Sequence, residues 1–174
     1  MSGFFEPFHR KSGSLVRDID LTINGETRRL AIDDAATLLE ALRNHLELKG
    51  ARYGCGAGQC GTCAVIIDGE DKASCQLEVG NLAGKQITTL EGIGTPDRPH
   101  PLQTAFLELN AGQCGYCLAG VLVGAKALLD RNPDPTRAEI AAALDWHLCR
   151  CAAHNRILAA VALAAKRMRE GVAA

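Results

Sequence analysis

Residues 54–63 of this chain read Gly54-Cys55-Gly56-Ala57-Gly58-Gln59-Cys60-Gly61-Thr62-Cys63. The cysteines follow a C-x4-C-x2-C pattern, and a fourth cysteine, Cys75, follows Cys63 after eleven intervening residues. This is the plant-type spacing of four thiolates that hold a [2Fe–2S] cluster. The glycines beside the first two cysteines permit positive φ and lack the Cβ that would keep the backbone from wrapping around a cluster. The pattern therefore predicts an iron–sulfur site on Cys55, Cys60, Cys63 and Cys75.

The other four of the eight cysteines form a second group. Cys114 and Cys117 make a C-x2-C pair, and Cys149 and Cys151 make a C-x-C pair after thirty-one intervening residues. The first pair is predicted at the start of a helix, where the free N–H groups and the helix dipole stabilise a thiolate. Four thiolates suit either a zinc ion or an iron–sulfur cluster, so the spacing alone leaves both open.

Composition limits the class of protein. The chain has 174 residues, 47% of them hydrophobic, which is enough for one or two globular domains. A net charge of −1 and 4% aromatic residues, without a basic stripe, argue against nucleic acid as a partner. The stretch 1–14 lacks the pattern of a signal peptide, and no apolar run is long enough to span a membrane. We therefore expect a cytoplasmic protein, in which a cysteine array is a metal site rather than a disulfide framework.

Residues 15–91 show mostly the alternation of strands that are buried on one face. Strands arranged around a single helix predict a small α+β domain, similar to the β-grasp fold of plant-type ferredoxins. Turn signals of the Asn-Gly and Asp-Gly type mark two hairpins. The predicted elements are a hairpin (15–23 and 26–32 around Asn24-Gly25), a helix (36–48, capped by Asp33 or Asp34), a second hairpin (63–67 and 70–76 around Asp68-Gly69) and a last strand (86–90).

Glycine and proline gather in residues 92–101, which predicts a linker. Residues 102–174 then favour an all-α domain, because alanine-rich helices pack closely into a compact four-helix arrangement. Thr136 and Glu139 have the spacing of a capping box. The helices are expected over residues 102–109, 117–129, 138–148 and 157–168. Residues 1–14 remain as an N-terminal extension.

Taken together, three motifs resemble one known family. Gly-Cys-Gly-x-Gly-x-Cys-Gly-x-Cys comes first, Gln-Cys-Gly-Tyr-Cys second and Leu-Cys-Arg-Cys third, over about 160 residues, nearly the whole chain. In this order they are similar to the iron–sulfur subunit of molybdenum hydroxylases of the xanthine oxidase family. The resemblance implies a [2Fe–2S] cluster on each group of four cysteines, one in a ferredoxin-like domain and one in a helical domain.

The resemblance also implies partners. A large subunit would hold the molybdopterin, and Gln113 and Cys151 are expected to lie against that pterin. Electrons from molybdenum would pass through the helical-domain cluster and then the ferredoxin-like cluster to an acceptor, for which an FAD-binding subunit and a cytochrome are both candidates. No catalytic residue is expected on this chain.

Two departures from the family pattern narrow the substrate. Many members continue the second motif with Thr-Pro-Gly and the third with Thr-Gly-Tyr, whereas this chain has Leu118-Ala119-Gly120 and Ala152-Ala153-His154. No predicted ligand is lost. The chain is less similar to the xanthine and carbon monoxide branches than to bacterial hydroxylases of N-heteroaromatic compounds or aldehydes.

Two other functions fit the same cysteines. A free-standing ferredoxin-like carrier would use the helical domain only for docking, and an interaction protein would hold a structural zinc there. Among single residues, Trp146 is expected to fill a core or an interface, His154 to be a polar residue in a helix's first turn, and His147 shows no ligand spacing. Arg150 either donates to a pterin or cluster or pairs with a carboxylate.

Overall fold

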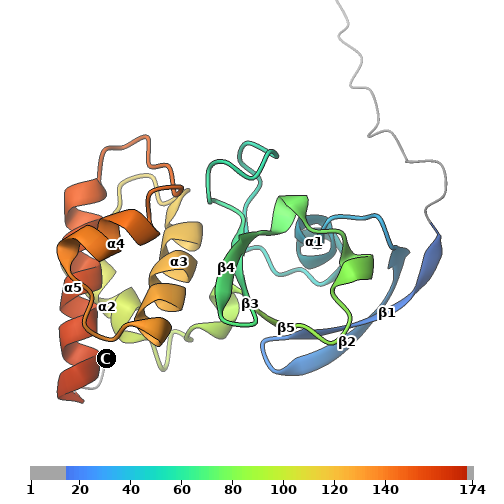
Figure 1. Ribbon diagram of the computed structural model, residues 1–174, viewed down its shortest axis with the longest axis horizontal. Helices are drawn as coiled ribbons and strands as arrows, with labels where there is room; N and C mark the ends of the chain where they lie inside the picture. The colour runs from blue at the N-terminus through green and yellow to red at the C-terminus, as the bar shows by residue number, and fades with distance from the viewer. Residues whose placement is uncertain (1–14, 172–174) are drawn as a thin grey trace, which may run out of the picture.

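The computed structural model describes residues 15–171, so the predicted extension 1–14 lies outside the described residues. Figure 1 shows a sheet with short helical segments beside a group of longer helices. The α+β prediction is confirmed. The described residues contain no helix that is both long enough and apolar enough to cross a membrane.

The sheet part is built from the two predicted hairpins. Five strands lie in the order β2-β1-β5-β3-β4, with β1 and β5 parallel and the other neighbours antiparallel. The turns between the hairpin strands have positive φ at both central residues, 52° and 84° at Asn24-Gly25 and 49° and 88° at Asp68-Gly69, as two-residue hairpins require. The strands are β1 (Val16–Ile23), β2 (Glu26–Asp33), β3 (Ala64–Ile67), β4 (Glu70–Ala73) and β5 (Gln86–Thr88).

The helix expected over 36–48 is shorter than predicted. It comprises α1 (Leu38–Glu40) and a π-helical turn, η1 (Ala41–His45). Its N-cap is Thr37, whose hydroxyl accepts from the N–H of Glu40 at 3.2 Å, and neither Asp33 nor Asp34 occupies that position. Positive φ at Glu47, 57°, breaks the helical path. The later leucines, Leu46 and Leu48, still pack against the core from a segment that is not helical, which is why their spacing resembled a longer helix.

The helical part contains α2 (Pro101–Glu108), α3 (Leu118–Arg131), α4 (Arg137–Ala143) and α5 (His154–Glu170). The capping box before α4 is confirmed, because Thr136 accepts from the N–H of Glu139 and the Glu139 carboxylate accepts from the N–H of Thr136 at 2.6 Å. α4 ends at Ala143 rather than at the expected Leu148. The chain turns away there so that residues 146–148 reach the sheet part.

Replacing Thr136 by alanine should destabilise the protein by about 1 kcal/mol, because the first turn of α4 loses its side-chain acceptor. The fall should appear in a denaturant titration of the purified protein. Thr104→Ala is the matched control, because the Thr104 hydroxyl donates only to the Pro101 carbonyl within α2. An equal loss in both variants would argue against a capping role.

The two parts pack through β3 and α3. All four residues of β3 are buried, because Val65 and Ile67 face the core beside α1 while Ala64 and Ile66 face the helical part. Small side chains on one face of α3 allow the helix to approach the sheet closely. A Cβ added at Gly120 of α3 would lie 1.9 Å from the carbonyl oxygen of Gly61. Strand β3 therefore has both faces covered.

Candidate metal centres

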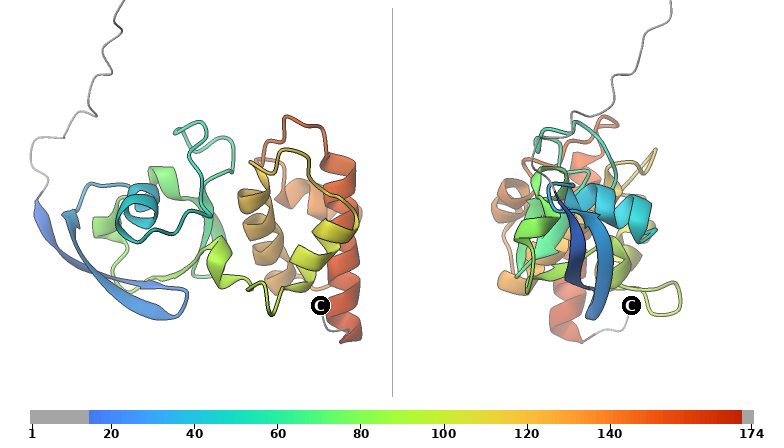
Figure 2. Two further views of the ribbon diagram at one scale, coloured as in Figure 1. Left: turned by 180° about the vertical axis from the view of Figure 1, so that it is seen from behind. Right: turned by 90° about the vertical axis from the view of Figure 1, so that its right-hand side faces the viewer.

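The first group of cysteines lies on two neighbouring segments. Cys55, Cys60 and Cys63 belong to residues 52–63, the first cysteine loop, and Cys75 lies on the short 3-10 helix η2 (Ser74–Gln76). The Ser74 hydroxyl donates to the Cys63 carbonyl at 2.7 Å, which holds η2 beside the end of the loop. Figures 1 and 2 show this loop rising beside the helical part.

Backbone N–H groups of the first cysteine loop point at its sulfur atoms. The Cys55 sulfur accepts from the N–H groups of Ala57 and Gln59, each at 3.3 Å, and the Cys60 sulfur accepts from the N–H of Cys55 at 3.3 Å. The first two donors lower the pKa of the Cys55 thiol to about 7. Glycines at 56 and 58, with φ of 68° and 71°, allow the backbone to turn its N–H groups inward. The loop is therefore shaped to stabilise thiolates.

Cys63 and Cys75 are buried. Burial, with the neighbouring Cys75 thiol, raises the pKa of Cys63 to about 11. A thiol in this setting stays protonated at neutral pH unless a metal displaces the proton.

The second group joins two further loops, residues 112–117 and residues 146–152, which we call the second and third cysteine loops. The Cys114 and Cys151 sulfur atoms lie 3.5 Å apart without a disulfide. The backbone N–H of Tyr116 lowers the pKa of Cys114. Burial and the neighbouring Cys149 raise the pKa of Cys117, at the N-terminus of α3, to about 12. The predicted second set of four cysteines is thus brought together.

Gln113 lies in contact with the third cysteine loop. Its side-chain amide donates to the Cys151 carbonyl at 2.9 Å, and Gln113 is exposed. The remaining face of this amide is therefore available to a group outside the chain.

Both sites fit an iron–sulfur cluster in their donor chemistry. Each offers four sulfur atoms and backbone N–H donors, which is the environment that [2Fe–2S] clusters use. Within residues 15–171, no three His, Cys, Asp or Glu side chains converge closely enough to hold a single metal ion.

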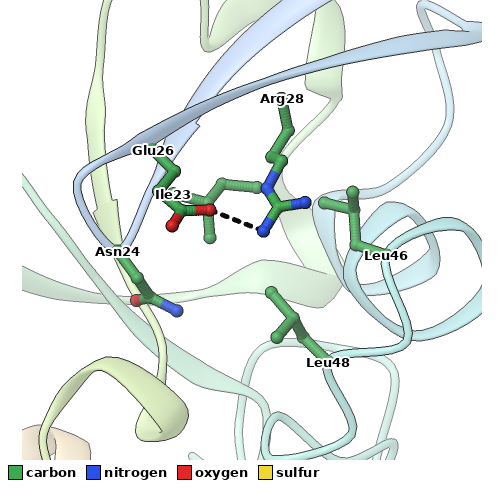
Figure 3. A pocket seen from close by; sticks show the side chains of 6 residues that line it. All are labelled: Ile23, Asn24, Glu26, Arg28, Leu46 and Leu48. Atoms are coloured by element: carbon green, nitrogen blue, oxygen red, sulfur yellow. Dashed lines mark hydrogen bonds and ion pairs between the residues drawn. The ribbon is translucent and has the colours of Figure 1, made fainter.

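A separate hollow lies between the β1–β2 turn and residues 46–48, and no cysteine lines it. In this hollow Arg28 pairs with Glu26 at 2.6 Å (Figure 3).

The first and second cysteine loops are tied together by Arg52 and Tyr116. The Arg52 guanidinium donates to the Gly115 carbonyl at 2.8 Å and lies 5.4 Å from the centre of the Tyr116 ring. The Tyr116 hydroxyl donates to the Tyr53 carbonyl at 2.5 Å. The positive charge of Arg52 also contributes to the lowered pKa of Cys114, after the larger effect of the Tyr116 N–H. These contacts place the two predicted cluster sites side by side.

Replacing Tyr116 by phenylalanine should cost about 1 kcal/mol of stability, because one hydrogen bond between the loops is lost while the ring remains. The loss should appear in the thermal unfolding midpoint. Tyr53→Phe is the matched control, because the Tyr53 contact uses its backbone carbonyl and not its hydroxyl. If both variants unfold alike, the Tyr116 hydroxyl does not link the loops.

Sequence reasoning missed Asp71 and His147, which lie between the two parts. Trp146 packs against the buried cluster that β3 and α3 share, as predicted, and its indole N–H donates to Asp71 at 3.0 Å. His147, which showed no ligand spacing, is only 4% exposed. His154 begins α5 and is exposed, which agrees with the prediction of a polar residue in the first turn. Nothing in the local pattern distinguishes Asp71 from the exposed acids of the other strands.

Comparison with known protein families matches both parts of the chain. A model described as "2Fe-2S iron-sulfur cluster binding domain" covers residues 21–87, and one described as "[2Fe-2S] binding domain" covers residues 89–162. The small FeS subunit of nicotinate dehydrogenase from Eubacterium barkeri is 43% identical over 149 residues, which is 86% of this chain and 95% of that protein. The chain belongs to the iron–sulfur subunits of the molybdenum hydroxylases.

Two solved structures share the fold of this iron–sulfur subunit. Quinoline 2-oxidoreductase from Pseudomonas putida has a chain that is 35% identical, with a TM-score of 0.84 over 89% of this chain and 97% of that one. The aldehyde oxidoreductase of Desulfovibrio desulfuricans is 40% identical with a TM-score of 0.85, and the match covers 88% of this chain but only 17% of that longer one. The chain is an electron-transfer subunit of an oxidoreductase with two [2Fe–2S] domains, as the motifs predicted.

Proposed function

We propose that this subunit relays electrons from a molybdopterin centre on a large partner subunit to an acceptor, through two [2Fe–2S] clusters. The observation that carries the proposal is that seven of the eight cysteines lie on three adjoining loops that hydrogen-bond to one another, with Cys75 on η2 beside the first loop. The backbone N–H of Leu148, next to Cys149, donates to the carbonyl of Cys60 at 3.1 Å. When bound, each cluster supplies a site that accepts and releases one electron.

The cysteines divide into two ligand sets in this proposal. The sheet part, with proposed limits 15–91, would hold one cluster on Cys55, Cys60, Cys63 and Cys75. Residues 92–101 form the linker, and a four-helix domain over 102–174 would hold the other cluster on Cys114, Cys117, Cys149 and Cys151. The N–H groups that already point at Cys55 and Cys60 would offset the negative charge of the thiolates.

The second set would lie nearer to molybdenum. Gln113 and Cys151 support this orientation, because an exposed amide held by the Cys151 carbonyl can offer its other hydrogen-bonding atoms to a pterin. Electrons would then reach the Cys55 cluster and leave to an FAD-binding subunit or a cytochrome. We further propose a cytoplasmic location, in keeping with eight unpaired cysteines.

For the complex as a whole we propose hydroxylation of an N-heteroaromatic compound, or oxidation of an aldehyde. Relatives are named for nicotinate, isoquinoline and aldehyde substrates, and those names support the class without selecting one member. The substrate site would lie on the partner, because the cysteine loops of this chain supply thiols and backbone donors, and their one histidine, His147, is buried.

Metal analysis of the purified complex tests this proposal against its two rivals. We expect about four irons per copy of this chain, which is two for each four-cysteine set, no stoichiometric zinc, and molybdenum that co-elutes with a larger subunit. A stable monomer free of molybdenum would instead indicate a free-standing carrier. Zinc with about two irons, the content of one cluster, would indicate a structural zinc site in the helical part.

A further inference from the structure

Three residues form a buried polar contact between the sheet part and the third cysteine loop. We call Asp71 of β4, Trp146 and His147 the interface triplet. The Asp71 carboxylate accepts from the Trp146 indole at 3.0 Å, and the same oxygen lies 3.4 Å from His147 Nε2. The side chains of His147 and Asp71 are only 1% and 15% exposed. Trp146 and His147 have ring centroids 4.4 Å apart.

The imidazole of His147 occupies space that two glycines leave free. A Cβ added at Gly61 would lie 2.4 Å from His147 Nδ1, and a Cβ added at Gly124 would lie 2.3 Å from Nε2. Gly61 belongs to the first cysteine loop and Gly124 to α3. The ring is therefore enclosed by both structural parts, and within residues 15–171 neither ring nitrogen makes a geometrically sound hydrogen bond.

This arrangement connects two segments that carry predicted cluster ligands. Gly61 follows Cys60, and His147 precedes Cys149 by two positions. Between them, the N–H of Leu148 donates to the carbonyl of Cys60 at 3.1 Å. A displacement of His147 or Trp146 would therefore move the third cysteine loop away from the first.

We propose that the interface triplet consists of positioning residues that hold the third cysteine loop against the first, and so fix the separation of the two clusters. The claim that the triplet fixes the cluster separation rests on the function proposed above. The claim that it holds the third cysteine loop in place does not depend on that function. Contacts far from the reacting centres strongly affect a reaction rate when they fix the distance between those centres, because small misplacements are costly.

Asp71→Ala in the purified complex tests the proposal. The variant leaves the Trp146 N–H without its acceptor, and we expect amide hydrogen exchange in residues 146–152 to rise by about tenfold, the equivalent of one buried unpaired donor. The magnetic interaction between the two reduced clusters in the EPR spectrum should also change. Asp71→Asn should restore both readouts in large part, because the amide oxygen can still accept from Trp146.

Asp20→Ala is the matched control, because Asp20 pairs with Arg29 on the exposed hairpin of the same part. It should leave both readouts unchanged. Trp146→Phe, which keeps an aromatic ring but removes the N–H donor, provides a second variant should Asp71→Ala fail to assemble. Unchanged exchange at 146–152, or an equal rise along the whole chain, would overturn the positioning role. Fewer than two cluster signals in the EPR spectrum would count against the proposed function. Hydrogen exchange would still test the positioning role in such a protein, because it measures the loop and not the clusters.

Discussion

Replacing Cys149 by serine is expected to abolish turnover of the complex with an artificial electron acceptor. A serine hydroxyl does not ionise near neutral pH, so the helical part loses one of its four thiolate ligands. Loss of a residue that merely supports a ligand costs about 10–100-fold in metal affinity or activity, and loss of a ligand should exceed the upper figure. Iron should fall to about two per chain, because only one cluster remains.

The other cluster should survive in this variant. Its cysteines lie on the first cysteine loop and η2, where the hydrogen bonds to Cys55 and the Ser74–Cys63 contact do not involve Cys149. The reciprocal variant, Cys55→Ser, is the matched control and should remove the other EPR signal. Unchanged turnover in Cys149→Ser would refute the order of the relay.

Replacing Gly120 by alanine is expected to lower stability substantially, although helix propensity alone favours alanine. At an exposed helix position the change would stabilise by about 1 kcal/mol. Here the new Cβ would lie 1.9 Å from the Gly61 carbonyl oxygen, and a backbone atom cannot rotate away as a side chain can. The helix and the first cysteine loop must separate, at a cost of about 3 kcal/mol.

The thermal midpoint should fall by roughly 6–12 °C for a chain of this length. Ala159→Gly in α5 measures the effect of helix propensity alone, because Ala159 is exposed and its side chain is not part of the packed interface. It should cost about 1 kcal/mol. A Gly120→Ala variant more stable than wild type would show that α3 and the first cysteine loop do not pack as described.

The hairpins could be predicted because their signals are local. Asn24-Gly25 and Asp68-Gly69 determine a two-residue turn by their own conformational preferences. The spacing of Cys55, Cys60 and Cys63 likewise predicts a ligand set from a short stretch of chain. The capping box before α4 belongs to the same class, because Thr136 and Glu139 lie within one helical turn of each other.

Features that depend on contacts between the two parts could not be predicted. α4 ends early because Trp146 reaches Asp71 of β4 and the N–H of Leu148 reaches the first cysteine loop, and helical spacing carries no information about those contacts. The length of the helix within residues 36–48 could not be predicted either, because Leu46 and Leu48 pack against the core without being helical. Asp71 and His147 acquire their surroundings only when β4, α3 and the first cysteine loop meet.

Low-temperature EPR of the dithionite-reduced protein, with iron and molybdenum counted on the same sample, tests the central claim most directly. Two cysteine sets of four predict two distinct rhombic [2Fe–2S] signals and about four irons per chain. Molybdenum in the sample would identify the complex. A single signal, with zinc in place of the missing iron, would contradict the relay and leave a one-cluster ferredoxin with a structural metal site.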